Sequence, residues 1–120
     1  MDRARFEALV GEAVASLPKS FRDRLENIAI IVEDYPGPEA GGRFRKRSLL
    51  GLYHGVPQTQ RSVWARYPFP DQIYIYQRNI EALCRTEEEV REQVRKTVIH
   101  ELAHYFGLSD EEIARLEREN

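Results

Sequence analysis

The hydrophobic positions near the start of the chain recur every three or four residues. This spacing predicts an amphipathic helix that Asp2 caps and Pro18 stops. We expect this helix to pack on the core as a support. Its apolar positions are Phe6, Leu9, Val10, Ala13, Val14 and Leu17.

Three stretches have the composition of β-strands. Residues 28–32 form a mostly β-branched run, which predicts a buried central strand. Residues 49–55 predict a second strand that ends at a glycine. In residues 73–76 aliphatic and aromatic side chains alternate, so we expect one face on the core and one toward a groove. The segment 33–42 is rich in Pro and Gly, and the segment 56–70 contains three prolines, so both are predicted to be loops.

The longest periodic stretch lies near the C-terminus. Thr86 and Glu89 form the sequence pattern of a capping box, which predicts a helix over residues 87–106. A second, shorter helix is expected over 111–117. The long helix has a continuous apolar stripe, formed by Val90, Val94, Val98, Ile99, Leu102, Ala103 and Phe106.

The last turns of this helix contain the pattern His-Glu-x-x-His, with His100, Glu101 and His104. Residues four apart lie on one helix face, so both imidazoles can point at one ion. Zinc accepts neutral imidazole at about 2.0–2.1 Å and leaves a position for water in catalytic sites. Glu101, next to the first histidine, is placed to act as general base on that water.

A third ligand is expected after the helix ends at Gly107, which tolerates a left-handed backbone. Asp110 follows where a carboxylate can close the site. Ser109 and Glu112 also form a capping-box pattern, so Asp110 can instead serve only as a helix-start residue. In that interpretation Glu111 and Glu112 are the alternative candidates for the third ligand.

The length and net charge of the chain limit the number of domains and the kinds of binding partner that we expect. The chain has 120 residues and a net charge of −2, which predicts a single domain over residues 1–120 and gives no electrostatic case for nucleic acid or an anionic membrane. A basic cluster at Arg43, Arg45, Lys46 and Arg47 is interpreted as a solvated loop.

One cysteine, Cys84, rules out an internal disulfide framework. The N-terminal stretch has no long apolar run, so neither a signal peptide nor a membrane span is expected there. We therefore expect a cytoplasmic protein.

Three segments resemble a known family, the small bacterial zincin-like metallopeptidases, also described as minimal zincins. They are residues 5–10 (RFEALV), 50–57 (LGLYHGVP) and 97–110, which contains His-Glu-x-x-His-x-x-Gly-x-x-Asp. The resemblance implies an α+β fold: a mixed sheet of three or four strands packed on the motif helix, with an N-terminal support helix. It also implies a Zn²⁺ cofactor, with His100, His104 and Asp110 as ligands and Glu101 as catalytic base.

Two functions remain open from the sequence. The first is a zinc-dependent peptide hydrolase that acts on a peptide or protein, whose extended chain pairs with the strand holding Tyr53 or the strand holding Tyr74. The second is a non-catalytic zinc-binding or protein-interaction domain, in which the metal staples the C-terminal helix. The oligomeric state stays open. Candidate substrate-binding residues are Tyr53, His54, Tyr74, Tyr76 and Arg78.

Overall fold

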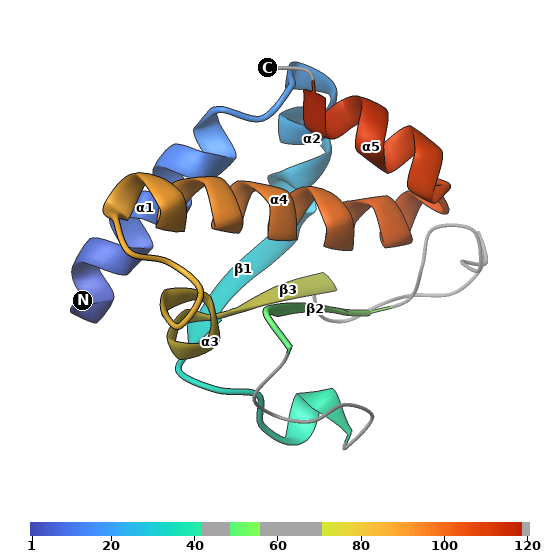
Figure 1. The fold of residues 1–120 in the computed structure, drawn as a ribbon. Coiled ribbons are helices and arrows are strands. Elements are labelled where there is room, and N and C mark those ends of the chain that lie inside the picture. Colours follow the sequence, from blue (N-terminus) through green and yellow to red (C-terminus); the bar gives the residue numbers. More distant parts are fainter. Residues whose placement is uncertain (42–48, 56–70, 119–120) are drawn as a thin grey trace.

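A computed structural model describes residues 1–41, 49–55 and 71–118. Among these residues, two helices precede the three strands along the chain and three helices follow them (Figure 1). The helices are α1 (Arg3–Ala15), α2 (Lys19–Arg24), α3 (Gln77–Glu81), α4 (Glu87–Phe106) and α5 (Asp110–Arg118), with 3-10 turns η1 (Leu25–Asn27) and η2 (Pro38–Ala40). The strands are β1 (Ile28–Glu33), β2 (Gly51–His54) and β3 (Asp71–Tyr76).

The described strands form one mixed sheet in the order β1-β3-β2. β1 runs parallel to β3, with Ile28 opposite Asp71, and β2 runs antiparallel to β3, with Gly51 opposite Ile75. The α+β class and the mixed sheet packed on a long helix are therefore confirmed.

The expectation that residues 28–32 form the central strand is wrong. β3 pairs on both sides and holds the centre, whereas β1 lies at one side of the described sheet. The reason is burial: Ile73 and Ile75 of β3 are fully buried, while the side chains of residues 28–32 are only half-buried. A β-branched run indicates a strand, but its rank in the sheet depends on tertiary packing.

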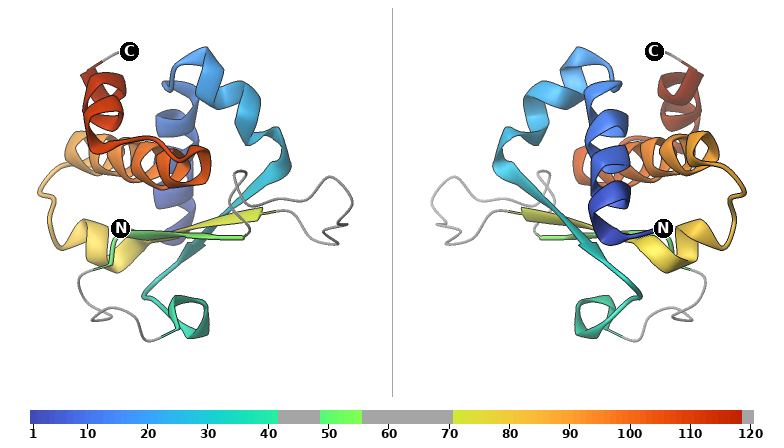
Figure 2. Two further views of the ribbon diagram at one scale, coloured as in Figure 1. Left: turned by 90° about the vertical axis from the view of Figure 1, so that its right-hand side faces the viewer. Right: turned by 90° about the vertical axis from the view of Figure 1, so that its left-hand side faces the viewer.

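The helices cover one face of the sheet. In Figures 1 and 2, α1, α2, α4 and α5 lie on the same side of the strands, and η2 lies on the other side. Ile73 and Ile75 face the helices, because alternate residues of a strand point to one face. The buried cluster between sheet and helices includes Phe6, Leu9, Ala13, Ile80, Val94, Val98, Ile99, Leu102 and Ala103.

The site helix α4 has the predicted bounds, Glu87–Phe106. The Thr86 side chain accepts a hydrogen bond from the N–H of Glu89, and Gly107 ends the helix in the left-handed conformation with φ 68°. The apolar stripe is buried as expected, except that Phe106 is partly exposed. Local signals at both ends and one buried face therefore fix this helix.

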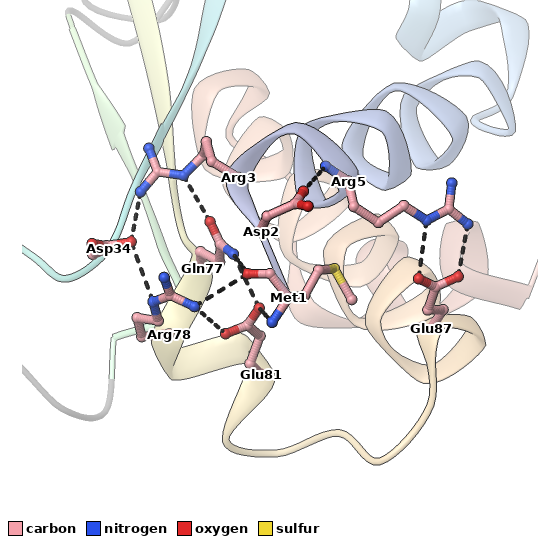
Figure 3. A network of polar contacts seen from close by, with 9 residues as sticks. All are labelled: Met1, Asp2, Arg3, Arg5, Asp34, Gln77, Arg78, Glu81 and Glu87. Carbon is pink, nitrogen blue, oxygen red and sulfur yellow. Dashed lines mark hydrogen bonds and ion pairs between the residues drawn. The ribbon is translucent and has the colours of Figure 1, made fainter.

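Polar contacts attach α1 to the rest of the fold (Figure 3). Asp2 caps α1 by accepting from the N–H of Arg5, as predicted. The Arg5 guanidinium forms two hydrogen bonds, of 2.9 and 2.7 Å, with the carboxylate of Glu87 at the start of α4. Arg3 bonds to Asp34 after β1 and to Gln77 of α3. The predicted support helix is thus joined to the start of the site helix.

Two parts of the sequence lie outside the described residues: the basic cluster at Arg43, Arg45, Lys46 and Arg47, and the long connection over residues 56–70. In the described part of the chain, no helix combines the length and the apolar character needed to cross a bilayer.

Candidate metal centre and adjoining groove

His100 and His104 lie one turn apart on an exposed face of α4. Their ring centroids are 4.8 Å apart, with the ring planes inclined at 65°. The carboxylate of Glu101 approaches the second histidine, with 3.9 Å between its Oε2 and Nδ1 of His104. The helix therefore brings two imidazoles and one carboxylate together, as the spacing predicts.

Glu101 has a different environment from the two histidines. Its side chain is 13% exposed, whereas that of His104 is 57% exposed. Its Oε2 accepts a hydrogen bond of 2.9 Å from the backbone N–H of Tyr53 in β2. Burial raises the pKa of Glu101 above its ordinary value, although the Tyr53 N–H and the charge on His100 act in the opposite direction. A carboxylate with a raised pKa is a stronger base than a solvent-exposed one.

A groove adjoins these residues between α4 and the start of β2. It has a volume of about 430 Å³. The strand side contributes Leu49, Leu50 and Gly51, and the helix side contributes Gln93, Lys96, Thr97, His100, Glu101 and His104. The imidazoles thus open onto a space large enough for part of a peptide chain.

β2 has a free edge on this side of the described sheet. The N–H of Tyr76 bonds to the carbonyl of Leu50, which points the backbone groups of Leu50 toward β3. In an antiparallel pair the next residue points the other way, so the backbone groups of Gly51 and Tyr53 face outward. The bond from Tyr53 to Glu101 fits this arrangement.

Asp110 is the first residue of α5 and is exposed. The predicted capping box is present: the N–H of Glu112 bonds to the Ser109 hydroxyl, and Glu112 accepts from the Ser109 N–H. Glu112 is therefore engaged in a cap, and Glu111 is exposed. Within the described ranges, no three His, Cys, Asp or Glu side chains form a group able to hold a metal ion.

The donor set can nevertheless be tested against zinc. Neutral imidazole nitrogens are preferred zinc ligands, and here two of them lie side by side on one helix face. The adjacent carboxylate of Glu101 is turned to the edge strand by the Tyr53 N–H. These residues fit the metal that the sequence pattern implies, with two nitrogen donors in place.

Tyr53 is the one candidate substrate-binding residue that contacts this centre. Its ring packs on that of Tyr105, with centroids 5.1 Å apart, and its hydroxyl bonds to the carboxylate of Asp71. Sequence reasoning placed Tyr53 near the site but missed Tyr105, Asp71 and the role of the Tyr53 backbone. No local pattern reveals a contact between residues 48 positions apart in the chain.

His54, Tyr74 and Tyr76 lie on the opposite face of the sheet. Tyr74 alternates with the core residues of β3, and His54 is paired across the strands with Gln72. The His54 ring meets that of Tyr74 edge-on at 6.3 Å, and the rings of Tyr74 and Tyr76 are stacked at 6.3 Å. The alternating strand therefore has a second face, but that face does not line the groove beside His100.

Arg78 also lies outside the groove, where it forms ion pairs with two carboxylates. Its guanidinium lies 2.9 Å from the carboxylate of Glu81 and 3.4 Å from that of Asp34 (Figure 3). It belongs to the polar network that joins α3, β1 and the start of α1, and it is not among the residues that line the groove.

A His-Glu-x-x-His helix packed against the outer strand of a small mixed sheet is typical of helix-borne metal-dependent hydrolases. The sequence profile of the family described as zincin-like metallopeptidase matches residues 25–120. The chain belongs to this family, which as a class uses zinc. Among proteins of curated function, no sequence relative was found.

Proposed function

We propose that this chain is a zinc-dependent peptide hydrolase. The observation that carries the proposal is the pair of imidazoles at His100 and His104, with the Glu101 carboxylate beside them, all lining one groove. The cytoplasmic location expected from the sequence stays a prediction.

His100 and His104 are the proposed nitrogen ligands. Asp110 is proposed as the third ligand because of its spacing after Gly107 and its exposure at the start of α5. When bound, zinc supplies a water of lowered pKa and polarises the carbonyl of the substrate.

The remaining chemistry belongs to the protein. Glu101 takes a proton from the attacking water on its carboxylate and gives it to the leaving amine. The N–H of Tyr53 fixes the orientation of that carboxylate through Oε2. The partial burial of Glu101 raises its pKa, which favours proton uptake.

In the described sheet, the free edge of β2 supports one of the two strands proposed to pair with the substrate. β3, which holds Tyr74, is paired on both sides, so it has no free edge. β2, which holds Tyr53, has an outer edge among the described strands, and that edge borders the groove. An extended substrate chain is therefore proposed to pair with β2, where Gly51 faces outward.

A purely structural role for the metal receives less support. α5 is already attached to α4 by protein contacts: the N–H of Leu108 bonds to the carbonyl of Ala103, and Ile113 of α5 is buried in the same core cluster as Leu102 and Ala103 of α4. A metal ion that linked the two helices would therefore add little to contacts that the protein already makes. This favours the catalytic proposal over the structural one.

The first prediction tests this proposal. The purified chain should bind about one zinc ion and hydrolyse a mixed peptide library, and Glu101→Gln should keep the zinc while hydrolysis falls by roughly 100-fold or more, as expected for loss of a general base. Metal content by atomic absorption and cleavage by mass spectrometry provide the two measurements. If Glu101→Gln cleaves as fast as the native chain, the assigned role of Glu101 is wrong.

A further inference from the structure

Among the described residues that line the groove beside the histidines, Lys96 has the one ammonium group. Lys96 lies in α4 one turn before His100 and is exposed at the groove lining. No residue in the described part of the chain forms an ion pair with it. The acidic residue one turn earlier, Glu92, lies 3.9 Å from Arg95 and lines a different pocket.

On the opposite side of the groove, the described lining residues are apolar. Leu49 and Leu50 form this side and are half-buried, and Gly51 continues it into β2. Beside Lys96 the helix side offers the neutral side chain of Gln93, while the Glu101 carboxylate is held by the Tyr53 N–H. Of the lining that the structure describes, a bound chain therefore meets aliphatic side chains on the strand side and the Lys96 ammonium group on the helix side.

We propose that this groove selects peptides that present a carboxylate to Lys96. The inference rests on the proposed function and names the substrate class of the same site. One helical turn separates Lys96 from His100, which is about 6 Å along the helix axis and roughly two residues of extended chain. The carboxylate is either an Asp or Glu side chain near the cleaved bond or the free C-terminus of the peptide.

The physical reason is electrostatic. Among the described residues the Lys96 ammonium group has no ion-pair partner, so it can attract a carboxylate, and a half-enclosed groove screens that attraction less than open water does. Lys96 stays accessible, so the gain is that of a partly exposed ion pair. We expect a preference on the order of fivefold in affinity over a neutral peptide of the same sequence.

Binding can be measured with the metal-free chain, so this test does not depend on turnover. Three fluorescent peptide libraries of one length are compared by anisotropy. The first has neutral side chains and an amidated C-terminus, and the second has the same side chains and a free C-terminus. The third has an amidated C-terminus and one fixed Glu. The native chain should bind one or both carboxylate libraries about fivefold more tightly. The library that is preferred identifies the source of the carboxylate.

Two variants with the same charge change complete the test. Lys96→Gln should remove the preference. Lys19→Gln should keep it, because Lys19 lies in α2, is 82% exposed and pairs with Asp23 outside the groove. The proposal is overturned if the native chain binds the three libraries equally or binds none of them. It is also overturned if Lys96→Gln keeps the preference unchanged.

Hydrolysis by the zinc-loaded chain separates this inference from the proposed function. Cleavage of neutral and carboxylate libraries at equal rates overturns the selectivity while the hydrolase proposal stands. Carboxylate-selective binding without any cleavage supports the groove assignment and overturns the hydrolase proposal instead.

Discussion

The absence of a side chain at Gly51 sets the distance between β2 and α4. A Cβ placed there would lie 2.5 Å from Cγ2 of Thr97 and 2.9 Å from the carbonyl oxygen of Tyr74. Both separations are shorter than side-chain carbons tolerate, so the strand or the helix would have to move. Because Gly51 and Thr97 line the groove, the width of the groove depends on this one position.

Gly51→Ala should therefore destabilise the fold by about 1–3 kcal/mol, the usual cost of overpacking. Urea unfolding followed by circular dichroism measures the change. Gly11→Ala is the matched control: it lies in α1 with nothing within 4 Å of the added Cβ, and it should stabilise by about 0.5–1 kcal/mol. Adding Thr97→Ser, which removes Cγ2, should recover part of the loss. Equal effects of the two Gly→Ala changes would contradict the packing argument.

Glu39 connects the loop after β1 to the far face of the sheet. Burial acts to raise its pKa, but hydrogen bonds from the backbone of Gly37 and Glu39 and from the Tyr76 hydroxyl outweigh burial and leave the pKa below its usual value. The Gly37 N–H and the Tyr76 hydroxyl both reach Oε2, at 2.7 and 2.9 Å. The ionised form is thus favoured by the fold.

A lowered pKa in the folded chain means that the unfolded chain binds more protons in acid. The stabilisation by Glu39 is therefore present above the ordinary glutamate pKa of about 4.3 and is lost as pH falls through the lowered folded value. Glu39→Gln should have a flatter dependence of unfolding free energy on pH below about 4.3, measured by urea titration at several pH values. Tyr76→Phe removes one hydrogen-bond donor to Glu39 and should flatten the same pH dependence in part. An unchanged pH dependence in Glu39→Gln would refute the role assigned to Glu39.

At the scale of elements, Gly107 separates α4 from α5. Its φ of 68° is in the left-handed region, and its N–H bonds back to the carbonyls of Ala103 and His104. Every residue with a side chain pays a steric cost in this conformation. The turn therefore sets where α5 begins relative to the site helix.

Gly107→Ala should lower the unfolding free energy by roughly 1 kcal/mol, and Gly107→Asn by less, because asparagine tolerates the left-handed region better. Thermal melting of both variants gives the ranking. If the alanine variant melts above the asparagine variant, conformational strain is not what makes this position a glycine.

The elements differ in how far the sequence predicts them. α4 was predicted to its last residue because caps, a buried stripe and a terminating glycine are all local signals. The position of β1 at one side of the described sheet was not predicted from the sequence. Strand order depends on which strand pairs with a neighbour on both sides, and that is decided by tertiary packing. At the site, the His100–His104 pair follows from helical spacing, whereas the Tyr53 N–H that holds Glu101 comes from another element.

At the scale of the whole molecule, metal binding should increase the free energy of unfolding. A ligand that binds only the folded state stabilises it by about 2.7 kcal/mol at 100 times its Kd. Zinc should therefore raise the melting temperature of the native chain, measured by calorimetry with and without a chelator. His104→Ala should greatly weaken this dependence.

The third histidine supplies the control. His54 is exposed on the far face of the sheet and outside the groove lining, so His54→Ala should respond to zinc as the native chain does. Equal loss of the zinc response in both histidine variants would place the metal somewhere other than on α4.

The hydrogen bond between Tyr53 and Glu101 has a consequence for association between chains. An outer strand with unpaired backbone groups is a place where further copies add and aggregate. Here the proposed base occupies the outward N–H of Tyr53 at the edge of β2. A chain that pairs with β2 as far as Tyr53 has to displace this carboxylate, so Glu101, while Tyr53 holds it, also protects that part of the edge from pairing with further copies.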